Sequence, residues 1–87
     1  MRRMKITETI NGELKESQLQ EFAEDYFISE YLNVYSTKMR NMVQMKVNSK
    51  TFNVTYRENR NYITNQTHYL AAVAFLSNID EAKYVIF

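Results

Sequence analysis

The chain has 87 residues, a length that suits one small domain, and a formal net charge of +1. It has no cysteine, which excludes disulfide bonds, thiolate metal sites and cysteine nucleophiles. Hydrophobic residues make up 45% of the chain, enough to build a core, so we expect a single small α+β domain over residues 1–87.

The first predicted element is a strand. Residues 4–10 alternate between apolar and polar side chains, as a half-buried strand does. Glu8 falls on the apolar side and interrupts it, which suits a strand at the edge of a sheet. Asn11-Gly12 is a turn signal with the only glycine of the chain, and we expect it to lead from this strand into a helix.

Residues 17–35, SQLQEFAEDYFISEYLNVY, predict the longest helix. Ser17 and Gln20 have the spacing of a capping box, and the acidic residues of the first half suit the positive end of a helix dipole. Apolar residues recur at intervals of three and four, as on the buried face of an amphipathic helix. They are Leu19, Phe22, Ala23, Tyr26, Phe27, Tyr31 and Val34.

The second half of this helix departs from the simple pattern. Glu30 projects into the apolar stripe, and a second apolar row lies on the other side of the helix. That row consists of Ile28, Leu32 and Tyr35. Either the helix ends near Ser29, or its second half meets another surface, such as a partner or a second copy of the chain.

A hairpin and a second helix follow. Two alternating segments, 42–47 and 51–57, flank the polar Asn48-Ser49-Lys50, which predicts an antiparallel hairpin. After a polar loop over 58–62, a helix is expected to begin at Thr64 or Asn65. The β-rich run KYVIF, residues 83–87, predicts a terminal strand.

The order strand, helix, strand, strand, helix, strand predicts a ferredoxin-like βαββαβ fold. In this fold two helices lie on one face of a four-stranded antiparallel sheet. The alternative is an α+β meander in which the first or last strand is an unpaired arm.

The sequence offers little catalytic chemistry. His68 is the only histidine, and it has no cysteine or acid at helical spacing to act with it. The single glycine cannot supply a phosphate-binding loop, and a run such as Glu21, Glu24 and Asp25 is usually a solvated helix face rather than a metal site. We therefore predict that the chain is not an enzyme and has no catalytic residues, metal or cofactor.

The small net charge hides a strong division. Residues 13–30 carry six acids and one base, whereas residues 38–60 carry six bases and one acid. These opposite charges either meet within the fold, join copies head to tail, or mark two separate binding faces.

Seven tyrosines in a chain of this length favour a protein-binding role, because exposed tyrosine is enriched at interfaces. We predict a small non-enzymatic protein-binding module whose acidic helix meets a basic partner surface, with Tyr31 and Tyr35 as apolar anchors. The predicted partner-binding residues are Glu21, Glu24, Asp25, Ile28, Tyr31, Leu32 and Tyr35.

The alternative is a nucleic-acid-binding protein whose basic hairpin within residues 38–60 contacts phosphates without reading sequence. Its predicted contacts are Lys46, Lys50, Arg57 and Arg60. An RNA-recognition motif is not supported, because residues 50–56 lack the signature glycine and the first strand has no aromatic residue to stack on a base. A homodimer formed through the second apolar row is a third hypothesis.

The Asn/Lys/Met/Tyr-rich composition is similar to that of accessory proteins of bacteriophages and mobile elements from AT-rich hosts. Many of those bind and inhibit a host protein, including nuclease-based defence systems, so a host or phage protein that handles nucleic acid is the expected partner. No apolar run resembles a signal peptide or a membrane span, which predicts a cytoplasmic location.

Overall fold

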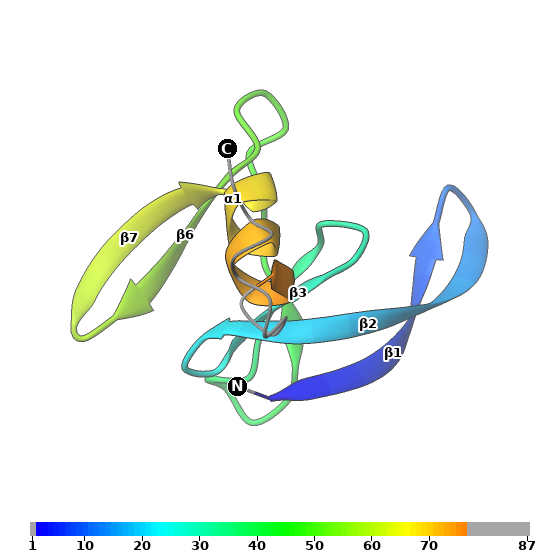
Figure 1. Cartoon of the computed structure of the whole chain (residues 1–87), viewed down its shortest axis with the longest axis horizontal. Helices are drawn as coiled ribbons and strands as arrows, with labels where there is room; N and C mark the ends of the chain where they lie inside the picture. The colour runs from blue at the N-terminus through cyan, green and yellow to red at the C-terminus, as the bar shows by residue number, and fades with distance from the viewer. Residues whose placement is uncertain (1, 77–87) are drawn as a thin grey trace.

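The computed structural model describes residues 2–76, and it is mostly β-structure (Figure 1). Five strands form one curled antiparallel sheet in the order β1-β2-β3-β4-β5. They are β1 (Arg3–Ile10), β2 (Glu13–Ala23), β3 (Tyr26–Ser29), β4 (Val34–Ser36) and β5 (Val43–Gln44). A second sheet pairs β6 (Asn53–Glu58) with β7 (Asn61–Gln66). The chain then enters α1 (Thr67–Ala71) and the π-helical turn η1 (Ala72–Leu76).

The predicted ferredoxin-like βαββαβ fold is wrong. Residues 17–35 do not form a helix: they form most of β2, all of β3 and the start of β4. A single short helix, α1 with η1, is present among residues 2–76. The predicted strand at 83–87 lies outside the described residues.

The error over residues 17–35 has a local cause. Glu21 pairs with Phe27 but Ala23 pairs with Tyr26, so Phe22 is the extra residue of a β-bulge. The bulge interrupts the two-residue alternation of β2, and both faces of the strand are covered from Leu19 onward. Apolar residues therefore recur at intervals of three and four, a spacing that imitates a helix.

Asn11-Gly12 forms a hairpin turn rather than the expected entry to a helix. Both residues have positive φ, 53° and 82°, as the central positions of a type I′ turn require. This turn joins β1 to β2, which pair along their whole facing length from Arg3↔Gln20 to Ile10↔Glu13. The strand predicted at 4–10 is confirmed as β1, and it lies at the edge of the sheet.

The predicted hairpin between 42–47 and 51–57 is also wrong. Only Val43 and Gln44 of the first segment are in a strand, and they pair with β4. The second segment supplies β6, which pairs with β7 across a two-residue turn at Asn59-Arg60. Both turn residues have positive φ, 51° and 70°. The sequence did not reveal this turn because arginine, unlike glycine, is not a usual residue at such a position.

The predicted second helix is present, but it begins later than expected. Thr64 and Asn65 belong to β7, and the helix starts at Thr67, whose amide donates to the Phe52 carbonyl at 2.9 Å.

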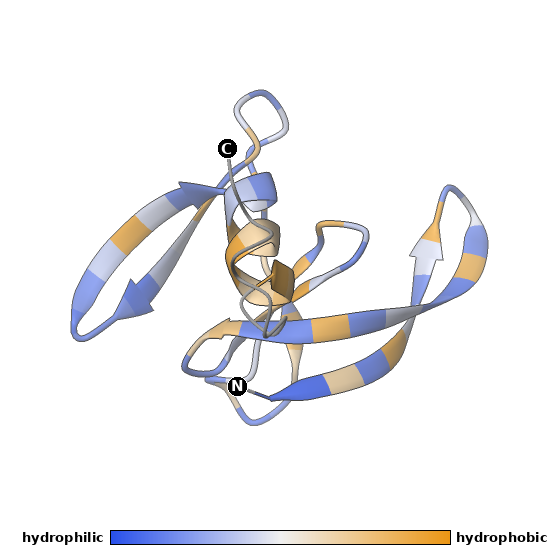
Figure 2. Ribbon diagram, viewed as in Figure 1, coloured by the Kyte–Doolittle hydropathy of each residue, from blue (hydrophilic) through white to orange (hydrophobic). Residues whose placement is uncertain are grey.

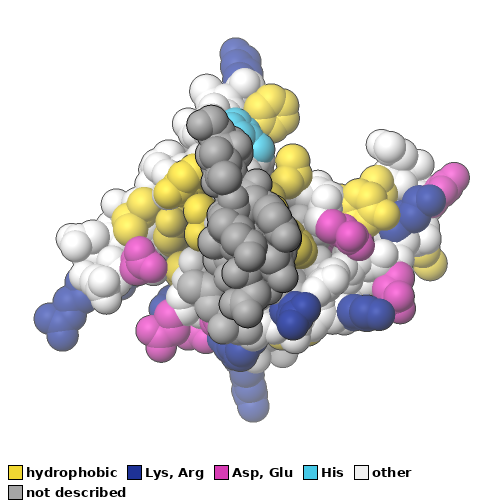
Figure 3. Space-filling model, viewed as in Figure 1, with side chains coloured by type: hydrophobic (Ala, Val, Ile, Leu, Met, Phe, Trp, Pro, Cys, Tyr) yellow, Lys and Arg dark blue, Asp and Glu magenta, His cyan; other side chains and the backbone are white. Residues whose placement is uncertain are grey.

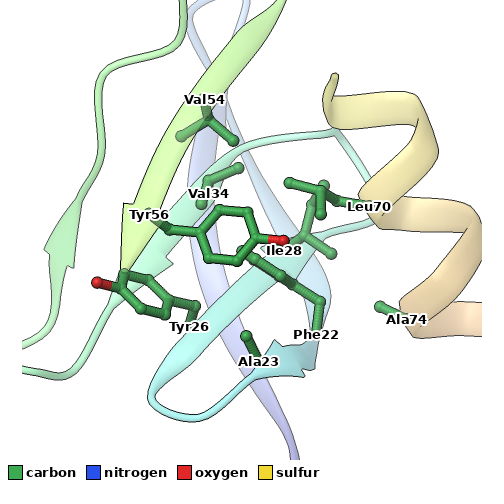
Figure 4. Packing of buried hydrophobic residues seen from close by; sticks show 9 residues of the cluster. All are labelled: Phe22, Ala23, Tyr26, Ile28, Val34, Val54, Tyr56, Leu70 and Ala74. Carbon is green, nitrogen blue, oxygen red and sulfur yellow. The ribbon is translucent and has the colours of Figure 1, made fainter. Parts of the chain in front are cut away.

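The main core lies between the curled sheet, the β6–β7 hairpin and the helix (Figure 4). Phe22, whose ring centroid lies 5.0 Å from that of Tyr56 in an edge-to-face contact, joins the first sheet to the second. Tyr26 packs on both of these rings, and its hydroxyl accepts the Arg57 amide at 3.1 Å. The buried members of this core are Phe22, Ala23, Tyr26, Ile28, Val34, Val54, Tyr56, Leu70 and Ala74.

Candidate functional site: the β3–β4 turn and its buried support

The turn between β3 and β4 presents two exposed apolar side chains. Tyr31 is 41% exposed and Leu32 is 40% exposed. Leu32 has φ 68°, in the left-handed region that a bulky L-residue rarely adopts. The backbone of this turn thus holds an apolar side chain in solvent and in a strained conformation.

Ser29, at the end of β3, fixes the shape of the turn. Its side chain is fully buried, and its hydroxyl oxygen accepts the amides of Tyr31 at 3.1 Å and Asn33 at 3.2 Å. The Ser29 backbone also donates to the Asn33 carbonyl and accepts the Leu32 amide. Four hydrogen bonds therefore converge on one residue, which makes the turn well defined despite its exposed tip.

Glu8 supports the turn from the edge strand. Its side chain is buried, and its Oε1 accepts Asn33 Nδ2 at 2.9 Å and the Tyr35 hydroxyl at 2.5 Å. Glu8, the acid that interrupts the apolar row of β1, is thus the buried acceptor that links β1 to Asn33 in the turn and to Tyr35 in β4.

The ionisation of these groups follows from burial and hydrogen bonding. Burial of the Glu8 carboxyl opposes its charge, but hydrogen bonding by Ser17, Tyr35, Asn33 and Ser29 outweighs burial and lowers its pKa. Burial, and then the bond to Glu8, raise the pKa of Tyr35 well above its ordinary value.

This polar network is not fully satisfied. Within residues 2–76, Glu8 Oε2 and Ser17 Oγ are buried and make no hydrogen bond of good geometry, although the Ser17 hydroxyl is close enough to favour the charged carboxylate. Each such group costs about 1–3 kcal/mol. Apolar side chains in place of Glu8 and of both its donors, Asn33 and Tyr35, would avoid that cost, so the network is better explained by the shape it gives the turn than by a net gain in stability.

Two of the predicted acidic contacts are neutralised within the fold. Glu21 is buried, and its Oε2 accepts Arg2 Nη2 at 2.8 Å while its Oε1 accepts the Arg2 amide at 3.0 Å. Asp25 also bonds Arg2 Nη2 at 2.8 Å, and Lys38 lies 3.8 Å from its second oxygen. The bond to Arg2 lowers the pKa of Glu21 to about 2 against the opposing effect of burial.

The other predicted partner-binding residues are separated by the fold. Ile28 is fully buried in the core, and Tyr35 is half-buried against Glu8. Glu24 is exposed in the β2–β3 turn, apart from the β3–β4 turn. Of the predicted set, Tyr31 and Leu32 are the adjacent, exposed apolar pair.

Ser29, Glu8 and Asn33 are the residues of this site that sequence reasoning missed. The interruption of the β1 apolar row by Glu8 was the available signal, because an acid on a buried face needs donors. The identity of those donors depends on strand pairing, which the helical interpretation of residues 17–35 concealed.

The predicted basic contacts come from different elements of the fold. Arg57 and Arg60 share the β6–β7 hairpin, whereas Lys46 follows β5 and Lys50 lies in the turn before β6. Lys and Arg side chains stand at several separate points of the molecular outline in Figure 3. None of these four residues forms an ion pair within the described part of the chain.

Among residues 2–76, no group of three His, Asp or Glu side chains is arranged to hold a metal ion. His68 is exposed on the first turn of α1. No helix within the same residues is long and apolar enough to cross a membrane. Comparisons with protein-family models, with curated proteins and with solved structures found no match for the chain.

Proposed function

We propose that the chain is a non-enzymatic protein-binding module that presents Tyr31 and Leu32 to a pocket on a partner protein. The observation that carries this proposal is the exposed, left-handed Leu32. A residue in this conformation costs of order 1–3 kcal/mol, and glycine or asparagine would adopt it at lower cost. Leu32 keeps this conformation although it is 40% exposed, and we infer that the apolar surface it presents serves a contact outside the fold.

Preorganisation supports the same interpretation. Binding by a loose loop loses affinity to the ordering of the loop, whereas a turn already held in place avoids that loss. The hydrogen bonds from Ser29 and from the Glu8–Asn33 pair hold this turn before any partner arrives. Of the acids predicted to bind a partner, Glu21 and Asp25 form ion pairs with Arg2 and Lys38. The proposed contact is therefore mainly apolar, and Glu30 is the exposed acid next to it.

The composition, similar to that of phage and mobile-element accessory proteins, favours a host or phage protein that handles nucleic acid as the partner, and inhibition as the outcome. The cysteine-free sequence is consistent with a cytoplasmic location. Pairing of two copies through Leu32 is a related form of the same contact, and sedimentation of the wild type against Leu32→Glu distinguishes it.

The test compares Leu32→Asn with Leu14→Asn as immobilised baits in a lysate of the source cells. Leu14 is more exposed, at 75%, but lies in β2 with ordinary strand backbone, so it controls for the loss of an exposed leucine. We expect one or more proteins to be captured by the wild type and by Leu14→Asn but not by Leu32→Asn. A buried anchor contributes about 2 kcal/mol or more, so purified partner should bind Leu32→Asn roughly 30-fold more weakly. Equal capture by Leu32→Asn would exclude the β3–β4 turn as the binding site.

A further inference from the structure

The β6–β7 hairpin is a two-stranded ribbon with two different faces. Directly paired residues of antiparallel strands project to the same side, and successive residues alternate. The inner side carries the pairs Val54↔Asn65 and Tyr56↔Ile63, which pack toward the core. The outer side carries the pairs Asn53↔Gln66, Thr55↔Thr64 and Arg57↔Tyr62.

The outer face is almost entirely polar and open to solvent. Five of its six residues are exposed and Asn53 is half-buried. The Thr55 and Thr64 hydroxyls bond each other at 2.7 Å across the middle of this face. Figure 2 draws most of β7 in hydrophilic colours, and Figure 1 shows the distal part of the hairpin standing clear of the rest of the molecule.

The charge on this face is positive, and no acid among residues 2–76 forms an ion pair with it. Arg57 lies 5.8 Å from the centre of the Tyr62 ring, which holds its guanidinium along the outer face. Arg60 projects from the turn, and neither arginine forms an ion pair within residues 2–76. The one acid of the ribbon, Glu58, pairs with Asn61 and therefore belongs to the inner side.

We propose that this outer face enters the major groove of B-form duplex DNA. The major groove is about 12 Å wide and admits a two-stranded β-ribbon. Side chains on one face of a strand repeat about every 6.7 Å, close to two base-pair steps of about 3.4 Å each. Arg57 and Arg60 supply the charge complementarity to the phosphates. Asparagine, arginine and threonine are residue types that read base edges in that groove.

The register assigns different tasks to the residues of the ribbon. Arg57 is placed to reach guanine O6 and N7, and Asn53 to reach adenine N6 and N7. Arg60, at the tip, is placed to contact a phosphate. This site shares no residue with the β3–β4 turn and goes beyond the proposed protein contact. Experiments can therefore refute DNA binding while the protein contact stands, or the reverse.

The first experiment measures the affinity of the full chain for a fluorescent 20-base-pair DNA duplex by anisotropy over a series of salt concentrations. The test variant is Arg57→Gln with Arg60→Gln. The matched control is Arg3→Gln with Arg40→Gln, two exposed arginines outside the ribbon that form no ion pair within residues 2–76.

We expect the ribbon variant to bind at least about tenfold more weakly, because a good base contact and a phosphate contact are both removed. Its logarithmic salt slope should also fall by about 0.9 for each phosphate that the variant no longer neutralises. The control variant should keep the wild-type affinity within about threefold. Equal losses of affinity in the two variants, or no binding of the duplex by the wild type at low salt, would overturn the proposal.

The second experiment replaces the DNA duplex with an RNA duplex and with single-stranded DNA of the same sequence. The major groove of A-form RNA is deep and narrow and does not admit side chains, so the RNA duplex should bind at least about tenfold more weakly. Equal binding of the RNA duplex would show that only phosphates are contacted, and tighter binding of the single strand would assign Tyr62 to base stacking; either result rejects groove insertion. Leu32→Asn should bind DNA as the wild type does, which separates this test from that of the protein contact.

Discussion

The curled sheet and the β6–β7 hairpin differ in whether their charged side chains have partners within the fold. In the sheet, Glu21 and Asp25 are bonded to Arg2, and Glu8 is buried among hydroxyl and amide donors. In the hairpin, Arg57 and Arg60 have no acidic partner within residues 2–76. The charges of the first region are thus used within the structure, whereas the two arginines of the second have no such use among the described residues.

This difference revises the simple division between an acidic segment and a basic one. Most acids of residues 13–30 form ion pairs with bases of the same fold, which are Arg2, Lys5, Lys15 and Lys38. Of the six bases in residues 38–60, Lys38 alone takes part in this neutralisation within the described residues. Net charge by segment therefore indicated where charge lies along the chain but not where it remains free.

The largest expected effect comes from breaking the junction between the two regions. Phe22→Ala removes the ring that packs edge-to-face on Tyr56 and should lower the free energy of unfolding by about 3–5 kcal/mol. Urea denaturation monitored by tyrosine fluorescence and circular dichroism measures it. Tyr62→Ala, on the exposed face of the hairpin, is the control and should change stability by less than about 0.5 kcal/mol. Similar effects of the two substitutions would mean that the hairpin does not share this core.

The second prediction tests the buried support of the β3–β4 turn. Glu8→Ala leaves Asn33 Nδ2 and the Tyr35 hydroxyl without their acceptor and should destabilise the fold by about 2–4 kcal/mol. Glu8→Gln retains a carbonyl acceptor and should lose roughly half as much. Hydrogen exchange of the Tyr31 and Asn33 amides should accelerate in Glu8→Ala more than that of β6 amides. Uniform acceleration across both regions would show that Glu8 acts on global stability alone.

The third prediction concerns acid. A carboxyl whose pKa is lowered by folding contributes stability above its unfolded pKa and loses that contribution as pH falls through the folded value. Glu21, whose pKa is about 2 in the folded state, should therefore contribute about 1–2 kcal/mol near neutral pH, reduced by the exposure of Arg2, and lose it between about pH 5 and pH 2.

Glu8 changes stability in the same direction, because its pKa is also lowered. Denaturation midpoints at a series of pH values measure the combined contribution of Glu8 and Glu21 to stability. The difference between wild type and Glu21→Gln gives the contribution of Glu21. A pH profile of Glu21→Gln that is as steep as that of the wild type would contradict the assignment to Glu21.

The smallest effects distinguish strain from function in the two exposed turns. Leu32→Gly and Arg60→Gly relieve the strain of a left-handed backbone conformation. Glycine also raises the entropy of the unfolded chain, which opposes this gain. The free energy of unfolding should therefore change by no more than about 1 kcal/mol in either variant. We expect the first to abolish partner capture and the second to weaken DNA binding. Loss of stability by more than about 1 kcal/mol in either variant would show that the side chain is structural.

The sequence predicted individual strands better than their pairing. The alternation in residues 4–10 located β1, and that in residues 51–57 located β6. The partner of β1 was missed because the choice of a helix for residues 17–35 removed β2 from consideration. The partner of β6 was missed because residues 58–65 were interpreted as a loop and the start of a helix. The Asn11-Gly12 turn was recognised in the sequence, but this pair most often predicts a β-hairpin rather than the start of a helix.

The candidate site was predicted in part. Tyr31 and Leu32 were both named as partner contacts, and both are exposed, although the helical interpretation also placed Tyr31 on the buried face. Their contact with a partner stays a prediction. Glu21 and Ile28 were assigned to the same surface only because a helix would have placed them there. In strands their directions differ: Glu21 turns toward Arg2, and Ile28 turns into the core.

By itself, the sequence determined that the chain has apolar material for one small core, that it has no cysteine chemistry, and that its charge divides along its length. Only the tertiary structure decided whether residues 17–35 were one helix or parts of three strands. The physical reason is that a β-bulge and a strand covered on both faces produce the same apolar spacing as a helix. The packing of the second sheet and α1 on Phe22, Tyr26 and Ile28 resolves that ambiguity, and those contacts join residues far apart in the chain.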